Sequence, residues 1–511
     1  MLASRRRFLS TAVAAPFATT FTNKFSLFPS WASGDLQRLQ ADPRRPQCHL
    51  LPAKNWMNDP NGPIYWKGQY HMFFQFNPGA AVWGDMHWAH AVSPDMIHWR
   101  HLPVALAPTP GWDDADGCFT GSAVDDHGTA TAIYTGVKSS SAEMATLRDG
   151  KSNFREVQCL ATSSDPQLLT WTKWKTPVIQ PPADPMLTGF RDPFLWRDGD
   201  IWYLGVGSGV RKQGGRVLLY RSRNLRQWEY LHPLATGHWT EHENSNPVDS
   251  GEMWECPDFF PLGAKHVLLY STAGKVVWEV GDLDPKELVF HPQRNGVLDH
   301  GAYYAQKTQL DAKGNRILWG WIPEKRPEAE FRAAGWAGCM ALPRVLSLTA
   351  ENNLEMRVAP VAESLRGKAF APIAPDTSSS ERSGRLKSIV IEHIAGEFSW
   401  KCATGPFALA IADDAGSWCS LQMEASSSSA TLEINEARFE VPPAPRTMEF
   451  HLFLDASVAE FFCNHQHVLT SRIYREPAGP LRLQLEPSGV AALDSLQAWQ
   501  LRAISRDRLT S

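Results

Sequence analysis

The sequence predicts an all-β protein in which a five-bladed β-propeller is followed by a β-sandwich. Three observations lead to this fold class. A strand rich in aromatic and aliphatic residues recurs five times, Gly, Asp and Asn turns separate the strands, and helical periodicity is nearly absent. Propeller blades are repeats of about 40–50 residues with four strands each, and insertions lengthen them.

The recurring strand begins at residues 70, 131, 201, 266 and 316, with the sequences YHMFFQF, TAIYTG, IWYLGVGS, HVLLYST and RILWGW. A second phrase follows three of these strands and consists of a Ser, a turn with Asp or Asn, and a closing Trp (SPDMIHW, SSDPQLLTW and SRNLRQW). We therefore expect five blades between residues 46 and 345. A β-sandwich built from long hairpins is the alternative for this region.

The sequence changes character after residue 346. Residues 346–385 are predicted to be a linker with a short helix, and residues 386–507 contain seven or so short alternating strands with polar turns. This pattern is typical of a β-sandwich. Because it holds few Trp residues, the second domain is expected to support the first or to make secondary contacts with a ligand.

The first 32 residues are predicted to be an export signal. Residues 4–9, SRRRFL, resemble a twin-arginine signal, and a short apolar stretch and a Ser-x-Ala cleavage site ending at Ala32 follow. The apolar stretch is too short for a membrane span. We expect a mature protein that works in the periplasm or outside the cell; a disordered basic N-terminus is the alternative.

Composition argues against several classes of partner. The net charge of −4 gives no electrostatic reason to expect nucleic acid or an anionic membrane. The eight Cys residues show no zinc spacing, so no metal site is expected, although Cys402 and Cys419 could form a disulfide. His87, His90, His98 and His101 are interpreted as ordinary blade residues. These features do not define an oligomeric state.

An acid precedes the recurring strand at one fixed distance in three of the five repeats. Asp59, Asp192 and Glu255 each lie 11 residues before a Tyr or His near the start of that strand, and a Pro follows each within two residues. Equivalent positions on different blades face one another across a propeller. The three carboxylates are therefore expected to meet at one rim, with a purely turn-stabilising role as the alternative.

Converging carboxylates in a chain with 21 Trp residues suit glycoside hydrolysis, in which one acid protonates the leaving oxygen and another attacks or activates water. Arg191 is expected to keep Asp192 ionised. The apolar residues of MWECPDFF, 253–260, are expected to desolvate Glu255 and raise its pKa, as a general acid requires. Asp59, among turn N–H groups and Asn amides, is expected to stay ionised as the nucleophile.

The motifs that hold these acids, WMNDPNG, FRDP and WECPD, resemble those of glycoside hydrolase family 32 and occur in the family's order. That family comprises β-fructosidases such as invertases, levanases, exo-inulinases and fructan exohydrolases. GCFTGSA, GWAG, LPR and DASVAEFF are similar to the family too. The resemblance implies a propeller plus β-sandwich and a retaining enzyme that releases terminal β-D-fructofuranosyl units from sucrose or fructans, without cofactor or metal.

The resemblance also implies residue roles, with Asp59 as nucleophile, Glu255 as acid/base and Asp192 as transition-state stabiliser. The positions implied to bind the fructosyl unit are Asn58, Gln75, Trp83, Phe119, Ser122, Arg191, Tyr303 and Trp321.

One loop departs from the plant invertases, which have an acid after the strand that matches RILWGW. Here the loop is IPEKRPEAE, with Arg326 at the matching position and Glu324 nearby, which favours fructan ends over sucrose. An inverting glycosidase, a fructosyltransferase that uses the same residues, and a sugar-binding propeller without catalysis are the alternatives.

Overall fold

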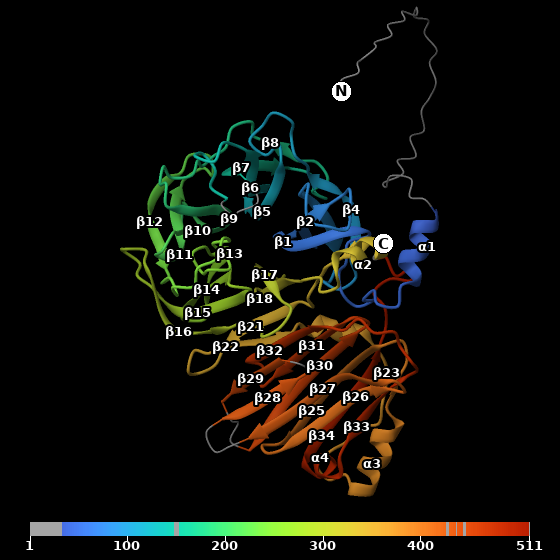
Figure 1. Cartoon of the computed structure of the whole chain (residues 1–511). Coiled ribbons are helices and arrows are strands. Elements are labelled where there is room, and N and C mark those ends of the chain that lie inside the picture. The colour runs from blue at the N-terminus through green and yellow to red at the C-terminus, as the bar shows by residue number, and fades with distance from the viewer. Residues whose placement is uncertain (1–32, 148–152, 426–428, 436, 443–445, 510–511) are drawn as a thin grey trace, which may run out of the picture.

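The chain folds into a ring of five sheets and a pair of larger stacked sheets, as the computed structural model in Figure 1 shows. The predicted fold class, a five-bladed β-propeller followed by a β-sandwich, is confirmed. The structure describes residues 33–147, 153–425, 429–435, 437–442 and 446–509, so the predicted export signal at 1–32 lies outside the described residues. Helix α1 (Ser33–Ala41) precedes the propeller.

Each blade is built on four antiparallel strands in chain order. The first blade has β1 (Asn55–Trp66), β2 (Gln69–Asn77), β3 (His87–Ser93) and β4 (Arg100–Leu106), and the second has β5 (Gly117–Asp126), β6 (Thr129–Ser139), β7 (Phe154–Ser163) and β8 (Thr172–Lys173). The third has β9 (Leu187–Asp198), β10 (Ile201–Val210), β11 (Gly214–Ser222) and β12 (Glu229–Thr236). The fourth has β13 (Glu255–Leu262), β14 (Lys265–Thr272), β15 (Lys275–Leu283) and β16 (Phe290–Val297). The fifth has β17 (Tyr304–Leu310), β18 (Arg316–Ile322), β21 (Arg344–Leu348) and β22 (Leu354–Val358).

The first strand of every blade lines the centre of the ring. These strands contact one another in sequence, β1 with β5, β5 with β9, β9 with β13, β13 with β17, and β17 with β1. The ring is closed by the segment after β18, which contains α2 (Glu328–Ala334), β19 (Trp336–Ala337) and β20 (Cys339–Met340). Strand β19 pairs in parallel with β1, while β20 pairs with β18, so this segment joins the last blade to the first.

The recurring strand found in the sequence is the second strand of each blade, β2, β6, β10, β14 or β18. Its apolar side chains are buried on both faces, because blades pack against neighbours on either side. The Ser-turn-Trp phrase connects the third and fourth strands. In the first blade, Asp95 accepts hydrogen bonds from the backbone N–H groups of Ile97 and His98, and Asn224 does the same in the third blade.

The boundary of the propeller differs from the predicted one at 345. Strands β21 and β22 complete the fifth sheet, so the propeller extends to Val358. The segment predicted as a linker, 346–385, thus contributes part of this blade. It also holds a 3₁₀ helix (Pro360–Leu365) and the first strand of the sandwich, β23 (Arg366–Ala369).

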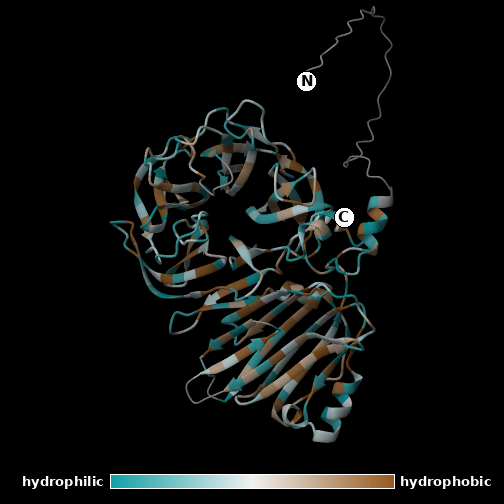
Figure 2. Ribbon diagram, in the orientation of Figure 1, coloured by the Kyte–Doolittle hydropathy of each residue, from teal (hydrophilic) through white to brown (hydrophobic). Residues whose placement is uncertain are grey.

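The sandwich consists of two six-stranded sheets. In spatial order, the first sheet has β23, β34 (Leu493–Leu501), β25 (Ala395–Ala403), β30 (Thr447–Asp455), β31 (Val458–Cys463) and β32 (His467–Arg472). The second has β24 (Val390–Ile391), β33 (Leu481–Leu485), β26 (Phe407–Asp413), β27 (Gly416–Ala425), β28 (Ala430–Ile434) and β29 (Ala437–Val441). Apolar and polar residues alternate along these strands, as Figure 2 shows.

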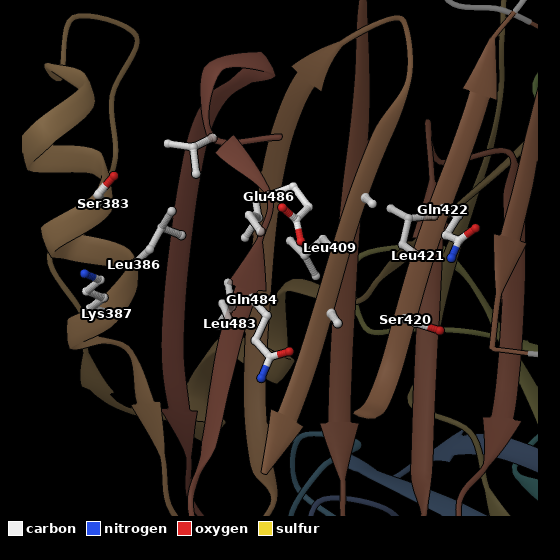
Figure 3. Close-up of a pocket in the computed structure, with 14 residues that line it drawn as sticks. Ser383, Leu386, Lys387, Leu409, Ser420, Leu421, Gln422, Leu483, Gln484 and Glu486 are labelled. Carbon is white, nitrogen blue, oxygen red and sulfur yellow. The ribbon is translucent and has the colours of Figure 1, made fainter. Parts of the chain in front are cut away.

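Two short helices, α3 (Ser379–Ser388) and α4 (Pro487–Ala492), pack beside the second sheet. A groove of about 460 Å³ lies between α3 and strands β26, β27 and β33, and Figure 3 shows its polar side chains, including Lys387, Gln422 and Glu486. None of the three predicted catalytic acids lines this groove. In the part of the chain that the structure describes, no helix is long and apolar enough to cross a membrane.

The disulfide considered for Cys402 and Cys419 is absent from the structure, since both thiols are free and buried. Cys402 lies on β25 and Cys419 on β27, which belong to opposite sheets of the sandwich. Both side chains pack in the apolar core between the sheets. They behave there as small apolar residues.

A buried network of charges joins the propeller to the sandwich. Arg344 of β21 lies 3.1 Å from Asp299 and 2.6 Å from Glu460 of β31, and all three side chains are fully buried. His49 bridges Glu460 and Asp455 at 3.0 and 2.7 Å. Burial lowers the pKa of His49, but the hydrogen bonds to the two carboxylates outweigh this effect and raise it to about 9. The imidazole, which precedes the first blade, is therefore a buried cation that two acids of the sandwich hold in place.

We predict that Arg344→Met destabilises the protein by about 3–5 kcal/mol, because it leaves Asp299 and Glu460 buried without their shared cation. Urea unfolding measures this loss. Arg357→Met on the adjacent strand is the matched control, because Arg357 forms a half-exposed pair with Glu355 and its removal should cost less than about 1 kcal/mol. Equal losses for the two variants would contradict this account of the interface.

Candidate active site

The three acids lie on the first strands of three blades, where each strand departs from regular pairing. Asp59 is on β1, Asp192 on β9 and Glu255 on β13. The pairing register shifts at the same level of all five inner strands, between residues 57 and 60, 118 and 121, 191 and 194, 255 and 258, and 304 and 307. Such bulges re-aim side chains. Here they surround one end of the channel.

The constant spacing of 11 residues holds in the sequence, but Asp192 does not occupy the same register as the other two acids. In the first hairpin of each blade, Tyr70, Trp202 and His266 hold the same place, one pair away from the turn. Trp202, and not Tyr203, is therefore the residue of the third blade that corresponds to Tyr70 and His266. Arg191 therefore takes the place that corresponds to Asp59 and Glu255, and Asp192 lies one residue further along. Its φ of 63° places it in the left-handed region, which accompanies the bulge and brings its carboxylate into the same cavity.

The three carboxylates line one cavity of about 260 Å³. Six of the eight predicted substrate-binding residues line it with them, namely Asn58, Gln75, Trp83, Phe119, Arg191 and Trp321. Residues that the sequence analysis did not select also contribute, namely Thr120, Leu147, Asn246, Val248 and Tyr304. Trp83 is 50% exposed, which places an aromatic ring at the solvent-facing side of the cavity.

Two predicted positions lie outside the cavity. The side chain of Tyr303 is buried against the guanidinium of Arg344, 4.4 Å from its ring centre, so the adjacent Tyr304 is the tyrosine of the site. Ser122 donates a hydrogen bond to the carbonyl oxygen of Pro193 at 2.8 Å and thereby ties two inner strands together below the acids. Both predictions of cavity contact are wrong, because a shift of one or two residues along a strand reverses or displaces the side chain.

Thr120 is the residue that the repeat pattern itself could have identified. It lies 11 residues before Thr131, the start of the recurring strand in the second repeat. Its hydroxyl donates a hydrogen bond of 2.6 Å to Asp59. This position of the repeat therefore carries a hydroxyl that binds an acid on the neighbouring blade, instead of an acid of its own.

Asp59 is held by hydrogen bonds to both of its carboxylate oxygens. Asn58 donates to Oδ1 at 2.9 Å, Thr120 donates to Oδ2, and the indole N–H of Trp56 fixes the Asn58 amide at 2.7 Å. Burial nevertheless raises the pKa of Asp59 above its usual value, the nearby Glu255 carboxylate adds to the rise, and the two hydrogen bonds oppose it. The carboxylate is oriented, but it is less readily ionised than the sequence analysis predicted.

Asp192 is almost completely buried, with 3% of its surface exposed. Its Oδ2 accepts a hydrogen bond from the backbone N–H of Cys256 at 2.9 Å. Burial, reinforced by the carboxylates of Glu255 and Asp59, raises its pKa to about 7, although Arg191 opposes the rise. The expectation that Arg191 keeps Asp192 ionised is wrong, because the guanidinium makes its hydrogen bonds to glutamates instead.

Glu255 lies between a cation and a hydroxyl. Arg191 donates to Oε1 from Nη2 at 2.8 Å and from Nε at 3.1 Å, and the hydroxyl of Tyr304 donates to Oε2 at 2.9 Å. The apolar surroundings predicted from MWECPDFF are not found, since the buried side chains of Trp254, Phe259 and Phe260 pack in blade cores and do not line the cavity. The side chain of Glu255 is 23% exposed and lines the cavity, so it can contact a ligand directly.

The loop IPEKRPEAE does not reach the cavity. Glu324 and Arg326 form a buried pair at 2.8 Å, and the side chain of Glu324 also accepts a hydrogen bond from Tyr474 of the sandwich. Burial raises the pKa of Glu324, but Arg326, Arg472 and Tyr474 outweigh it and hold the pKa at about 2. These residues fix the segment that closes the ring.

Comparison with known proteins identifies the family. Residues 49–360 match the family described as "Glycosyl hydrolases family 32 N-terminal domain", and residues 376–500 match "Glycosyl hydrolases family 32 C terminal". The chain belongs to glycoside hydrolase family 32. The predicted enzyme class, an O-glycosyl hydrolase of the β-fructofuranosidase family, is confirmed.

Relatives of this family 32 enzyme cover almost the whole chain. It is 35% identical to a sucrose-6-phosphate hydrolase of Escherichia coli over 89% of this chain and 94% of the relative. Among solved structures, a family 32 β-fructofuranosidase of Bombyx mori is 29% identical with a TM-score of 0.73, covering 92% of this chain and 96% of that one. Fructan 1-exohydrolase IIa of Cichorium intybus is 26% identical with a TM-score of 0.73, covering 90% and 98%.

We predict that Asp192→Asn stabilises the protein more at pH 8 than at pH 4. The carboxyl of Asp192 holds its proton up to about pH 7 in the folded protein, whereas the unfolded chain loses it near pH 3.8. The contribution of this carboxyl to stability is therefore complete below pH 3.8 and is lost as the pH rises through 7. Asn cannot ionise and avoids this loss. The difference from the wild type in urea unfolding should grow by about 2–4 kcal/mol over this range.

Asp198→Asn on the same strand is the control, because Asp198 is exposed. Its stability relative to the wild type should not change with pH. An Asp192→Asn difference that stays flat from pH 4 to pH 8 would contradict the buried, proton-binding state of Asp192.

Proposed function

We propose that this family 32 enzyme is a retaining, exo-acting β-fructofuranosidase that releases terminal β-D-fructofuranosyl units from sucrose and fructans. The observation that carries the proposal is the convergence of Asp59, Asp192 and Glu255 on one small cavity. Two carboxylates flanking a glycosidic bond are the machinery of glycosidases, and in the retaining class one of them is the nucleophile. The relatives include a β-fructofuranosidase and a fructan exohydrolase by name, which supports fructose as the unit released.

In the first step, Asp59 attacks C2 of the fructosyl unit while Glu255 donates a proton to the departing oxygen. The bond between C2 and the leaving oxygen breaks, and an ester bond between C2 and Asp59 forms. Asn58 and Thr120 each hold one oxygen of Asp59, which limits rotation of the nucleophile. Glu255 must carry a proton for this step.

In the second step, water attacks C2 and the ester bond to Asp59 breaks. Glu255, now ionised, accepts the proton of that water and returns to its starting state. Arg191 and Tyr304 already donate hydrogen bonds to its carboxylate and stabilise the ionised form that the first step creates.

Asp192 is assigned to the fructose hydroxyls. A carboxyl that accepts a backbone hydrogen bond on one oxygen retains capacity for a sugar hydroxyl on the other. As positive charge develops at C2, this group and the adjacent Arg191 hold the ring in place, so that the transition state is bound more tightly than the substrate.

Exo action agrees with the position of Lys307 in the channel beneath the acids. The ammonium of Lys307, which is buried, donates to the carbonyl oxygens of Pro193 and Pro257 at 3.4 and 3.1 Å. These prolines directly follow Asp192 and Cys256, so Lys307 spans the channel beneath the acids. We infer that this buried ammonium blocks the channel to a threading chain, so that a terminal unit is the part of a fructan that enters the cavity.

Fructan ends are assigned as the preferred substrate over sucrose. The loop acid expected to hold glucose in plant invertases is absent from the cavity, because Glu324 is locked in its pair with Arg326. The exposed Trp83 offers an apolar ring face to the unit beyond the cleaved bond. Among the described residues that line the cavity, Arg191 is the single cation and two glutamates already bind it.

The decisive experiment compares fructose release from inulin, levan, sucrose and sucrose 6-phosphate and follows the anomer by NMR. We predict faster release from inulin and levan than from either disaccharide, with β-fructofuranose as the first product. The α-anomer as first product would establish inversion, and transfer products at high substrate would establish a fructosyltransferase. No fructose from any of the four would overturn the proposal.

We also propose that the enzyme is exported through residues 4–9, which the sequence analysis identified as similar to a twin-arginine signal. Replacing Arg5 and Arg6 with Lys should leave fructosidase activity in the cytoplasm of the producing bacterium. Arg7→Lys keeps the arginine pair and is the matched control. Activity that is exported equally well from both would overturn the signal assignment.

A further inference from the structure

A fourth carboxylate lies directly behind the site. Glu156 is on β7 of the second blade, does not line the cavity, and has a fully buried side chain. Its Oε1 accepts a hydrogen bond from Nη1 of Arg191 at 2.9 Å, and its Oε2 accepts one from the backbone N–H of Phe190 at 2.7 Å. Both oxygens therefore bind consecutive residues of β9, immediately before Asp192.

Arg191 is shared between this buried acid and the proposed proton donor. One edge of its guanidinium faces Glu156, and the Nε and Nη2 groups face Glu255. A guanidinium carries one positive charge, which two carboxylates divide here. If Glu156 were absent, the whole charge would act on Glu255 and favour its ionised form.

Burial explains why Glu156 can hold Arg191 firmly. A buried carboxylate without a partner is strongly unfavourable, so the pair is maintained whether or not substrate is bound. The backbone of the glutamate is held in turn by the segment before its strand, because its N–H donates to the Thr146 hydroxyl at 2.8 Å. Arg191 therefore has one permanent partner, Glu156, and one exchangeable partner, Glu255.

We propose that Glu156 is a positioning residue that restrains Arg191 and thereby keeps Glu255 able to carry the proton for catalysis. The inference rests on the proposed role of Glu255 as general acid. The other ionisable groups that face Glu255 are Tyr304 on β17, Cys256 on its own strand, Asp59 on β1 and Asp192 on β9. None of them changes in the variants below.

The test measures kcat/KM against pH on sucrose and on β-D-fructofuranosyl fluoride, whose leaving group needs no proton. On sucrose, the alkaline limb of the wild type reports loss of the proton from the general acid. Glu156→Gln should move this limb to lower pH by about one unit, because Arg191 then stabilises the Glu255 carboxylate more strongly. Activity on the acid plateau should fall less than about tenfold, and the fluoride profile should lack this limb.

Glu156→Asp keeps the charge but shortens the side chain, so it should move the limb in the same direction by less. It also provides a second test if Glu156→Gln does not fold. The matched control is Glu397→Gln in the sandwich, another buried glutamate that binds an arginine, Arg366. Its profile should coincide with that of the wild type.

Two results would overturn the inference. One is a uniform loss of kcat/KM at every pH without movement of the limb in both Glu156 variants, which is the signature of a structural role. The other is an equal shift in Glu397→Gln. The proposed function fails separately, because a wild type with the same alkaline limb on sucrose and on the fluoride would remove Glu255 as the acid.

Discussion

Closure of five blades into a ring forces their inner strands to face one another, and the site depends on this constraint. Each inner strand breaks its pairing at the same level, so side chains that a regular strand would direct into a neighbouring blade turn toward one cavity. Three carboxylates that are far apart in the sequence meet there. Burial raises the pKa of Asp59 and of Asp192, and repulsion from the neighbouring carboxylates adds to the rise, so gathering these acids in one cavity costs stability.

The rest of the molecule provides the rigidity that such a site requires. Two motifs similar to family 32, LPR and DASVAEFF, supply Arg344, Asp455 and Glu460 to the buried network between the domains. A third, GWAG, closes the ring, because Gly338 adopts a φ of 78° and a Cβ there would lie 2.1 Å from the carbonyl oxygen of Met57. These motifs are structural, while WMNDPNG, FRDP and WECPD carry the acids.

The fold and the three acids could be predicted because both depend on local patterns. Strand alternation, turn residues and a repeated spacing are properties of short segments. The environment of each acid could not be predicted, since it depends on bulges and on contacts between blades. Arg191 is an example of such contacts between blades, because it adjoins Asp192 in the sequence and yet binds Glu255 and Glu156. Tyr303 and Tyr304 show the same limit, since strand register alone decides which of them faces the cavity.

A covalent bond between Asp59 and the fructosyl unit distinguishes the proposed retaining reaction from inversion, and trapping this adduct would establish it. The Glu255→Ala variant is mixed with β-D-fructofuranosyl fluoride, quenched rapidly and digested for mass spectrometry. The fluoride needs no proton to leave, whereas hydrolysis of the adduct is slowed without its base, so the account predicts an adduct of one fructosyl unit on the peptide that contains Asp59. Two results would contradict covalent attachment to Asp59. One is the release of fructose without any adduct, and the other is an adduct that is still found when Asp59→Asn is combined with Glu255→Ala in one chain.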